Sequence, residues 1–357
     1  MTRSLAVFLV LALTAHAVEP GVQRTLFGRA ADGTTIDAFT LTNRGGATAK
    51  IITFGAVIAD LQIPDRDGKI AHVVREAVFS EENYQRGFPQ SAMIAGRVAN
   101  RIANARFTLD GHDYPLIANN GAHTLHSGPK GFGKIIWQGE PVASTDGAAV
   151  RLSYFSPDGD CGFPGNLKIS VTYTLTDANV LRLEFRATTD KPTPINVTNH
   201  AFFNLAGGGD VTNYVLTLHA DRFTPTDATG IPSGEIVTVK GTPLDFTAPA
   251  SLGARVEQLG ATKRYDNNFV NIRTTPGLIR AAHIADPKTG RALEVWTTEP
   301  GLQLYTSPLD TATAAGRLGF FCLESQHFPD SVHHENFPST ILRPGESFSS
   351  ITEFRFR

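Results

Sequence analysis

The chain has 357 residues, a formal net charge of −2 and a hydrophobic fraction of 41%. This is the composition of a globular protein with enough apolar residues for a large core. The nearly neutral balance argues against nucleic acid and against an anionic membrane surface as partners, because both bind clusters of Lys and Arg. The 33 glycines, 21 prolines and 23 phenylalanines favour strands and turns over helices.

The first 17 residues predict a secretory signal peptide. Arg3 precedes an unbroken apolar run, Leu5–Leu13, and Ala15–Ala17 fits the small-residue pattern of a cleavage site. A membrane anchor is the alternative, but this run is far shorter than the roughly 20 residues that a spanning helix needs. We therefore expect cleavage near Ala17 and an exported protein, periplasmic or secreted.

Strand patterns dominate the rest of the chain. Leu167–Leu175 and Leu181–Arg186 alternate between apolar and polar residues around a turn at Thr176–Asn179, which predicts an antiparallel hairpin with one buried face. Other strands are expected, in chain order, at Ala49–Ile63, Val150–Phe155, Tyr214–Ala220, Arg291–Thr297, Gly301–Thr306 and Ile351–Arg357.

Helical patterns are few. Ser80–Gln85 predicts one helical turn, and Ser251–Gly260 predicts a short helix with Ser251 as its N-cap. Strands and helices do not alternate, which argues against a parallel sheet. We expect one all-β domain over residues 18–357, a large antiparallel β-sandwich with few short helices.

Two cysteines, Cys161 and Cys322, allow one disulfide in an exported protein. Cys161 lies in a loop rich in Gly and Pro, whereas Cys322 lies in an apolar strand. These different settings favour two free thiols.

Ionisable and amide side chains gather in a few short stretches of the sequence. Taken singly, His200 is typical of a buried core histidine, Asp266 of a turn and Arg101 of a structural ion pair. Taken together, carboxylate, amide, imidazole and guanidinium groups interleaved with aromatic residues are typical of a sugar site. The candidate residues are Asn100, Arg101, His126, His200, Asp266, Gln303 and Glu324.

A metal site is not expected. His123 and His126 form a pair three residues apart, but they lack further ligands at a suitable spacing, and on an extended strand they would point to opposite faces. His333 and His334 are typical of a solvated loop. His327 is expected to support the end of the strand that carries Glu324.

Five ordered motifs resemble those of the aldose 1-epimerase (galactose mutarotase) family, from about Gly33 to the C-terminus. They are Asn100–Ala103 with Phe107–Gly111, Leu125–Gly128 with Phe132 and Trp137, Thr198–Leu205, Thr298–Thr306, and Cys322–Asp330 with Phe337-Pro338. Pro344–Glu346 closes the series.

The resemblance implies a galactose mutarotase-like supersandwich that binds a monosaccharide and needs no cofactor. By motif, Glu324 resembles the general base of the family and His200 its general acid. Arg101, His126 and Asp266 resemble the residues that hold the sugar hydroxyls and the ring oxygen, with Asn100 and Gln303 as further contributors. The reaction implied is the exchange of α and β anomers of aldohexoses such as glucose and galactose.

This acid and base suit ring opening. The base takes the proton of the C1 hydroxyl, the acid protonates the ring oxygen, and the C1–O5 bond breaks. A glutamate with a raised pKa and a histidine charged near neutrality are expected for such a task.

Several residues depart from the family pattern. Ser127 replaces a glycine, and the motif around Asp266 reads Asp-Asn-Asn-Phe. The segment Val74–Phe79, with Arg75-Glu76-Ala77, replaces a stretch that borders the sugar in relatives, so it leaves the preferred sugar open.

Two other functions remain as alternatives. A secreted carbohydrate-binding protein would keep the pocket without turnover, and a glycosidase would use Glu324 and Asp266 as its two carboxylates. A hexose-6-phosphate epimerase would need an added basic cluster, which these motifs lack. The sequence leaves the oligomeric state, monomer or homodimer, open.

Overall fold

The structure, a computed structural model, describes residues 20–89, 91–273, 276–308 and 317–357. The predicted signal peptide, residues 1–17, lies outside the described residues. Among these residues, every pair of named strands is antiparallel. The predicted all-β, antiparallel fold class is confirmed.

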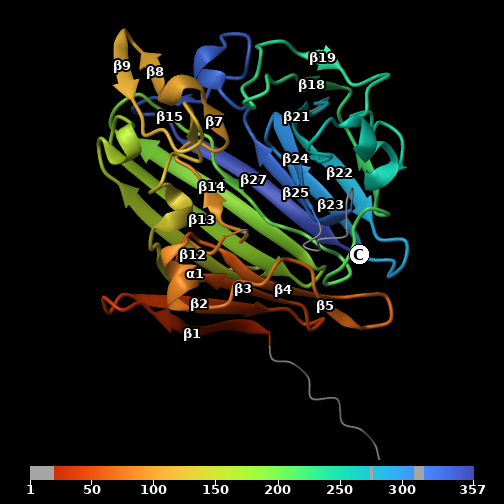
Figure 1. The fold of residues 1–357 in the computed structure, drawn as a ribbon. Coiled ribbons are helices and arrows are strands. Elements are labelled where there is room, and N and C mark those ends of the chain that lie inside the picture. The colour runs from red at the N-terminus through yellow and green to blue at the C-terminus, as the bar shows by residue number, and fades with distance from the viewer. Residues whose placement is uncertain (1–19, 90, 274–275, 309–316) are drawn as a thin grey trace, which may run out of the picture.

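The largest sheet has nine strands and runs through the middle of the molecule (Figure 1). In spatial order its strands are β11 (Gln138–Val142), β12 (Gly147–Ser156), β13 (Leu167–Thr176), β14 (Val180–Thr189), β27 (Phe348–Phe356), β23 (Ala292–Thr297), β22 (Ile279–Ala285), β17 (Val215–Leu218) and β20 (Ala250–Ser251).

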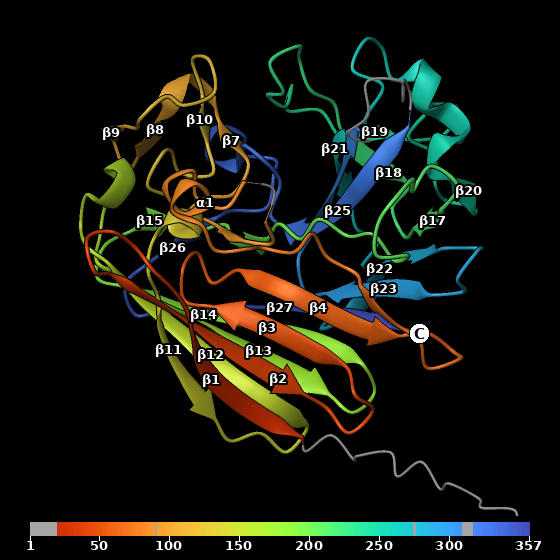
Figure 2. The same cartoon turned by 60° about the horizontal axis from the view of Figure 1, so that its bottom comes forward.

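A second sheet lies across β12 and β13 (Figure 2). Its strands follow chain order: β1 (Gly21–Arg29), β2 (Thr35–Thr42), β3 (Thr48–Ile52), β4 (Ile58–Pro64) and β5 (Ile70–His72). Leu152, Val171 and Phe39 are fully buried between the two sheets and belong to one continuous hydrophobic cluster. Each such side chain contributes about 1.5–3 kcal/mol by its burial.

The third sheet lies beside the β22–β23 end of the nine-stranded sheet (Figures 1 and 2). Its order is β19 (Val237–Thr238), β18 (Arg222–Thr224), β21 (Asp266–Val270), β24 (Gly301–Pro308) and β25 (Leu318–Gln326). This sheet carries Asp266, Gln303 and Glu324, so it positions much of the candidate site.

Short strand pairs and helices complete the described chain. The pairs are β6 (Ile94–Ala95) with β16 (Thr198–Asn199), β7 (Arg101–Ile102) with β10 (Thr124–Leu125), β8 (Arg106–Leu109) with β9 (His112–Pro115), and β15 (Thr193–Pro194) with β26 (Ile341–Leu342). The helices are α1 (Glu81–Gln85) and the 3₁₀ turns η1 (Ala103–Ala105), η2 (Phe132–Lys134), η3 (Asp160–Gly162), η4 (Leu252–Gln258) and η5 (Ser331–His333).

The predicted hairpin is confirmed as β13 and β14, joined at Asp177–Asn179. The expected single strand Ala49–Ile63 is wrong, because the chain turns at Gly55 and Ala56, which have φ of 62° and 47°. Glycine adopts this left-handed conformation without steric cost, so Gly55 lets β3 fold back onto β4.

The two predicted helices differ in outcome. The Oγ of Ser80 accepts a hydrogen bond from the N–H of Asn83 at 3.1 Å, so α1 begins with a side-chain cap. The second is the 3₁₀ helix η4, and Ser251 makes no capping hydrogen bond. Cys161 and Cys322 are both free, as predicted. No helix within the described ranges is long and apolar enough to cross a membrane.

Candidate active site

The site is centred on one face of the third sheet. The strand register places Asn268, Gln303 and Glu324 side by side on β21, β24 and β25. Side chains two residues apart on a strand share a face, so the next row on this face contains Asp266, Tyr305 and Cys322. A strongly polar cluster is thus built from strands whose other face packs into the hydrophobic core.

Glu324 is a nearly fully buried carboxyl group on this face, with 2% of its side chain exposed. Its Oε1 lies 3.5 Å from Nε2 of His200, while its Oε2 has no hydrogen-bond partner. Burial raises the pKa of Glu324 well above its ordinary value, and the negative charge of Asp266 adds to the rise. Arg101 acts in the opposite direction.

His200 directly follows β16 and is held there by its backbone N–H, which donates to the carbonyl of Met93 at 2.9 Å. Its ring stacks on Phe202, with centroids 4.8 Å apart and an angle of 15°. Burial lowers the pKa of His200 to about 4. The expectation of a histidine charged near neutrality is therefore wrong, because desolvation outweighs a backbone hydrogen bond and the charge of Asp266, which both raise the pKa.

Polar contacts with three neighbouring side chains hold the guanidinium of Arg101 in place. Its Nε donates to Oδ1 of Asn120 at 3.0 Å, and its Nη1 lies 3.5 Å from Oδ1 of Asn100. Nη2 lies 3.8 Å from Oδ2 of Asp266. These contacts fix the plane of the guanidinium at the edge of the face that carries Glu324.

His126 contacts both Asn100 and His200. Its Nδ1 accepts a hydrogen bond from the N–H of Asn100 at 3.1 Å, so the neutral ring carries its proton on Nε2. The ring packs edge-on against His200 with centroids 5.4 Å apart. Burial is the main cause that holds the pKa of His126 well below its ordinary value, and repulsion from His200, when that ring is protonated, and from Arg101 adds to it. A neutral Nε2–H donor results.

Asp266 joins Arg101 to Gln303. Nε2 of Gln303 donates to Oδ1 of Asp266 at 2.8 Å, which leaves the buried Oε1 of Gln303 without a partner. Gln303 is also the cross-strand neighbour of Glu324. An unpartnered buried acceptor is costly unless something else supplies its hydrogen bond.

The structure brings all of the predicted site residues together in one ring of contacts. The ring passes from Glu324 to His200, His126, Asn100, Arg101, Asp266 and Gln303, and back to Glu324. These residues come from six separate places in the sequence. The convergence therefore depends on the fold.

Three further residues of this site are not among those expected from the sequence. Asn120 holds the guanidinium of Arg101, and Phe202 and Tyr305 form an aromatic corner with His200. Asn120 lies between the motifs, whereas Phe202 and Tyr305 lie within Thr198–Leu205 and Thr298–Thr306, two residues after His200 and Gln303. This alternation of the two aromatic residues with the candidate residues was the available signal.

The other histidines lie outside the ring. His123 contacts the backbone of Asn104 and the side chain of Thr229, while His333 contacts Asp330 at 2.6 Å. In the part of the chain that the structure describes, no group of three or more His, Cys, Asp or Glu side chains could hold a metal ion.

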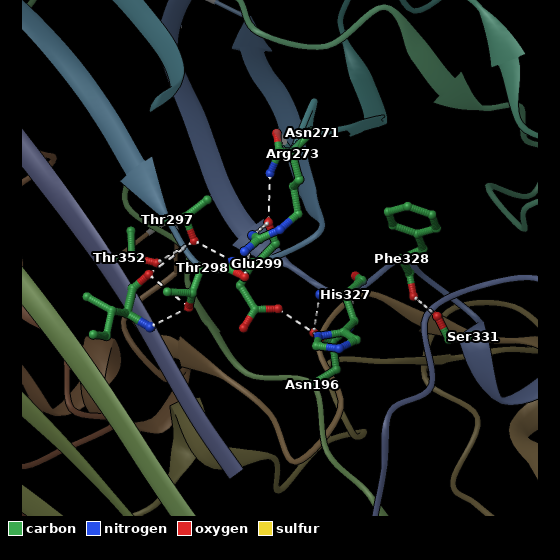
Figure 3. A network of polar contacts seen from close by, with 11 residues as sticks. Asn196, Asn271, Arg273, Thr297, Thr298, Glu299, His327, Phe328, Ser331 and Thr352 are labelled. Atoms are coloured by element: carbon green, nitrogen blue, oxygen red, sulfur yellow. Dashed lines mark hydrogen bonds and ion pairs between the residues drawn. The ribbon is translucent and has the colours of Figure 1, made fainter. Parts of the chain in front are cut away.

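A network of polar contacts lies at the end of β25 (Figure 3). His327 Nδ1 lies 2.6 Å from Oε2 of Glu299, and its backbone N–H and C=O both bond to the side chain of Asn196. The carbonyl of Glu299 accepts from Asn271 and Arg273. His327 thus supports the end of the strand that carries Glu324, as predicted.

Two departures from the expected motifs have structural explanations. Ser127 is buried, and its Oγ accepts from the N–H of Val98 at 2.8 Å and contacts the carbonyl of the same residue. Arg75 donates its N–H to the carbonyl of Phe202, and its guanidinium lies 5.6 Å from the ring centre of Phe320. Phe320 shares the face of Glu324 on β25, so Arg75 lies farther along the same surface.

A buried carboxylate and imidazole in contact, with amide, guanidinium and aromatic groups around them, define the class of site. Such a site binds a polyhydroxylated ligand and exchanges protons with it. Comparison with known proteins gives the same class. The family model described as aldose 1-epimerase matches residues 37–355.

Relatives of known name agree over nearly the whole chain. The galactose mutarotase of Sus scrofa is 39% identical over 346 residues, which cover 94% of this chain and 98% of the relative. The aldose 1-epimerase of Escherichia coli K12 is 38% identical over 346 residues, with 92% and 97% covered.

Solved structures show the same fold. An aldose epimerase homologue from C. elegans is 32% identical with a TM-score of 0.80, over 89% of this chain and 98% of that one. The galactose 1-epimerase from Lactobacillus acidophilus is 25% identical with a TM-score of 0.82, over 95% and 99%. The chain belongs to the aldose 1-epimerase family.

Proposed function

We propose that this protein interconverts the α and β anomers of free aldohexoses by opening and re-closing the sugar ring. The 3.5 Å contact between Glu324 and His200, buried within a cluster of hydroxyl-binding groups, carries this proposal. The two oxygens that exchange protons in the reaction are bonded to the same carbon, C1. A base and an acid in contact with each other can therefore reach both.

Glu324 acts as the base and His200 as the acid. Glu324 takes the proton of the C1 hydroxyl while Nε2 of His200 protonates O5, and the C1–O5 bond breaks to leave an open-chain aldehyde. After rotation about C1–C2, O5 attacks the other face of C1, returns its proton to His200, and O1 takes the proton of Glu324. Each positioned group contributes about 10²–10⁴-fold to such a reaction.

The pair must hold one proton for this cycle. Burial raises the pKa of Glu324 and lowers that of His200, so in the free protein this proton is on Glu324. The reactive arrangement of carboxylate and imidazolium forms when the proton crosses the 3.5 Å contact. Negative charge that develops on the sugar oxygens is stabilised by Arg101 at the edge of the site.

The remaining residues of the ring bind the sugar hydroxyls. His126 offers its Nε2–H as a donor, and Gln303 offers its free Oε1 as an acceptor. Asp266 and Asn100 accept hydrogen bonds from the sugar hydroxyls or orient the neighbouring side chains. Phe202 and Tyr305 give an apolar corner against which the C–H groups of the sugar pack.

The two alternatives are less well supported. A binding protein without turnover does not need an unpartnered, buried carboxylate in contact with an imidazole. A glycosidase needs Asp266 as a second reactive carboxylate, whereas both oxygens of Asp266 are engaged by Gln303 and Arg101.

Polarimetry tests the proposal. Fresh α-glucose and α-galactose should reach anomeric equilibrium faster with the protein than without it, and aryl glycosides should stay intact. Sugar binding without faster exchange would favour the binding protein, and release of the aryl group would favour the glycosidase.

We also propose that residues 1–17 direct export and that residues 18–357 form the working domain. The Arg3 charge, the apolar run and the Ala15–Ala17 pattern support this. Mass spectrometry of the protein from its native host should find Val18 as the mature N-terminus. A retained Met1 would contradict cleavage.

A further inference from the structure

A tight loop between Thr226 and Pro232 lies against the guanidinium of Arg101. A Cβ atom on Gly230 would stand 2.9 Å from Cζ of Arg101, so the loop backbone contacts the guanidinium directly. Gly230 has φ of +85°, a conformation that L side chains rarely adopt. Arg101 is thus held between Gly230 on one side and Oδ1 of Asn120, at 3.0 Å, on another.

The loop is braced internally by Asp227. Oδ1 of Asp227 accepts hydrogen bonds from the N–H of Thr229 at 2.8 Å, from the hydroxyl of Thr229 at 2.7 Å and from the N–H of Ile231 at 3.1 Å. The N–H of Gly230 donates to the carbonyl of Asp227 at 3.1 Å. Gly230 therefore moves with Thr229 as one unit.

One side-chain hydrogen bond ties this unit to the β10 segment. Oγ1 of Thr229 lies 3.0 Å from Nε2 of His123. The hydroxyl proton of Thr229 is directed at Asp227, so Oγ1 accepts and Nε2 of His123 must carry a proton. Nδ1 of His123 accepts from the N–H of Asn104 at 3.1 Å, which requires the same neutral tautomer.

His123 is in turn joined to the other residue that holds Arg101. The N–H of His123 donates to the carbonyl of Asn120, and the N–H of Asn120 donates to the carbonyl of His123, both at 3.1 Å. The hydrogen bond between His123 and Thr229 thus links the two supports of Arg101, Asn120 and Gly230, to each other.

We propose that His123 and Thr229 form a clasp that holds the Thr226–Pro232 loop against Arg101 and so sets the position of its guanidinium toward the sugar. They are positioning residues that touch no substrate, and the proposal rests on the proposed function for its ligand. Arg101 contacts the sugar both before and during ring opening. Loss of the clasp should therefore raise KM, and because Arg101 also stabilises charge that develops during ring opening, kcat should fall with it.

The test compares three variants. Thr229→Val removes the hydroxyl at constant shape and should raise KM about fivefold or more, whereas Thr229→Ser keeps the hydroxyl and should restore the wild-type KM to within about twofold. Thr247→Val is the matched control, because Thr247 makes the same two hydrogen bonds to Asp245 on an exposed loop. It should behave as wild type.

A double-mutant cycle decides whether the clasp acts through Arg101. In an Arg101→Met background, Thr229→Val should raise KM no further. An equal rise in both backgrounds, or an unchanged KM in Thr229→Val, would overturn the proposal. A general loss of structure would instead lower the fraction of folded protein without changing KM.

Direct binding separates this proposal from the proposed function. The dissociation constant for galactose, measured by calorimetry, should weaken in Thr229→Val by the same factor as KM rises. A wild type that binds galactose but does not speed anomer exchange would contradict the proposed function alone. Unchanged affinity in Thr229→Val beside normal wild-type turnover would contradict the clasp alone, and a wild type that neither binds galactose nor turns it over would overturn both.

Discussion

Nε2 of His200 and Oε1 of Glu324 lie 3.5 Å apart, with 13% and 2% of their side chains exposed. One residue follows the short strand β16 and the other lies within β25, so residues more than a hundred positions apart meet. Because burial opposes charge on both groups, the neutral acid and the neutral imidazole are favoured together. The pair is poised to exchange one proton with a bound sugar.

Replacing Glu324 by Gln should remove this exchange. An amide of the same shape cannot take the C1 proton, so accelerated mutarotation should fall by about 10²-fold or more in polarimetry. The fold should persist, because Oε2 of Glu324 has no hydrogen-bond partner to lose. Near-normal activity in Glu324→Gln would remove this residue from the mechanism.

The pH dependence of kcat/KM should report the proton held by the pair, because kcat/KM reflects the ionisable groups of the free protein. Below a pH of about 4 His200 binds a second proton, and the carboxylate that accepts from the sugar is lost. At high pH, above the raised pKa of Glu324, the pair loses its only proton and the acid is absent. A bell-shaped profile with its acid limb near pH 4 is expected from stopped-flow polarimetry. An acid limb near the ordinary histidine pKa would contradict it.

The sequence predicted the fold class and the site members but not how the members meet. The alternation of apolar and polar residues in Leu167–Thr176 reveals a half-buried strand, because successive side chains of a strand point to opposite faces and this pattern is visible in the local sequence alone. The short strands β6, β7, β10 and β16 have no such pattern, because each is only two residues long and is positioned by tertiary contacts.

The charge state of His200 could not be predicted from the sequence either. His200 was expected to be charged, and its lowered pKa follows from burial beneath residues distant in the chain. Similarly, the turn at Gly55-Ala56 could not be predicted, because one continuous strand and two buried strands joined by a turn have a similar, mostly apolar composition.

Replacing Arg97 by Met should destabilise the protein. Arg97 is fully buried, and its guanidinium donates to the carbonyls of Pro164, Gly165 and Ser156 and to two hydroxyls. Burial lowers its pKa to about 10. Orphaned acceptors cost roughly 1 kcal/mol or more each, so urea denaturation should show a loss of about 3 kcal/mol or more. Arg186→Met, at an exposed position, should stay within about 0.5 kcal/mol of wild type.

The stability of the protein should depend on pH through His333. The hydrogen bond to Asp330, at 2.6 Å, raises the pKa of His333 above its ordinary value of 6.5. A raised folded-state pKa contributes stability that is fully present below the unfolded pKa and is lost as the pH rises through the folded one. His333→Ala should therefore lower the free energy of unfolding more at about pH 5 than at about pH 9.

Urea denaturation at the two pH values measures this difference. The control is His112→Ala, since His112 is an exposed histidine on β9. It should cost little at either pH. Asp330 also accepts from the N–H of Ala103 and donates its own N–H to the carbonyl of Arg101, so the interaction braces the segment that carries Arg101. An equal loss in His333→Ala at both pH values would mean that the ring contributes by packing alone and that its charge is irrelevant.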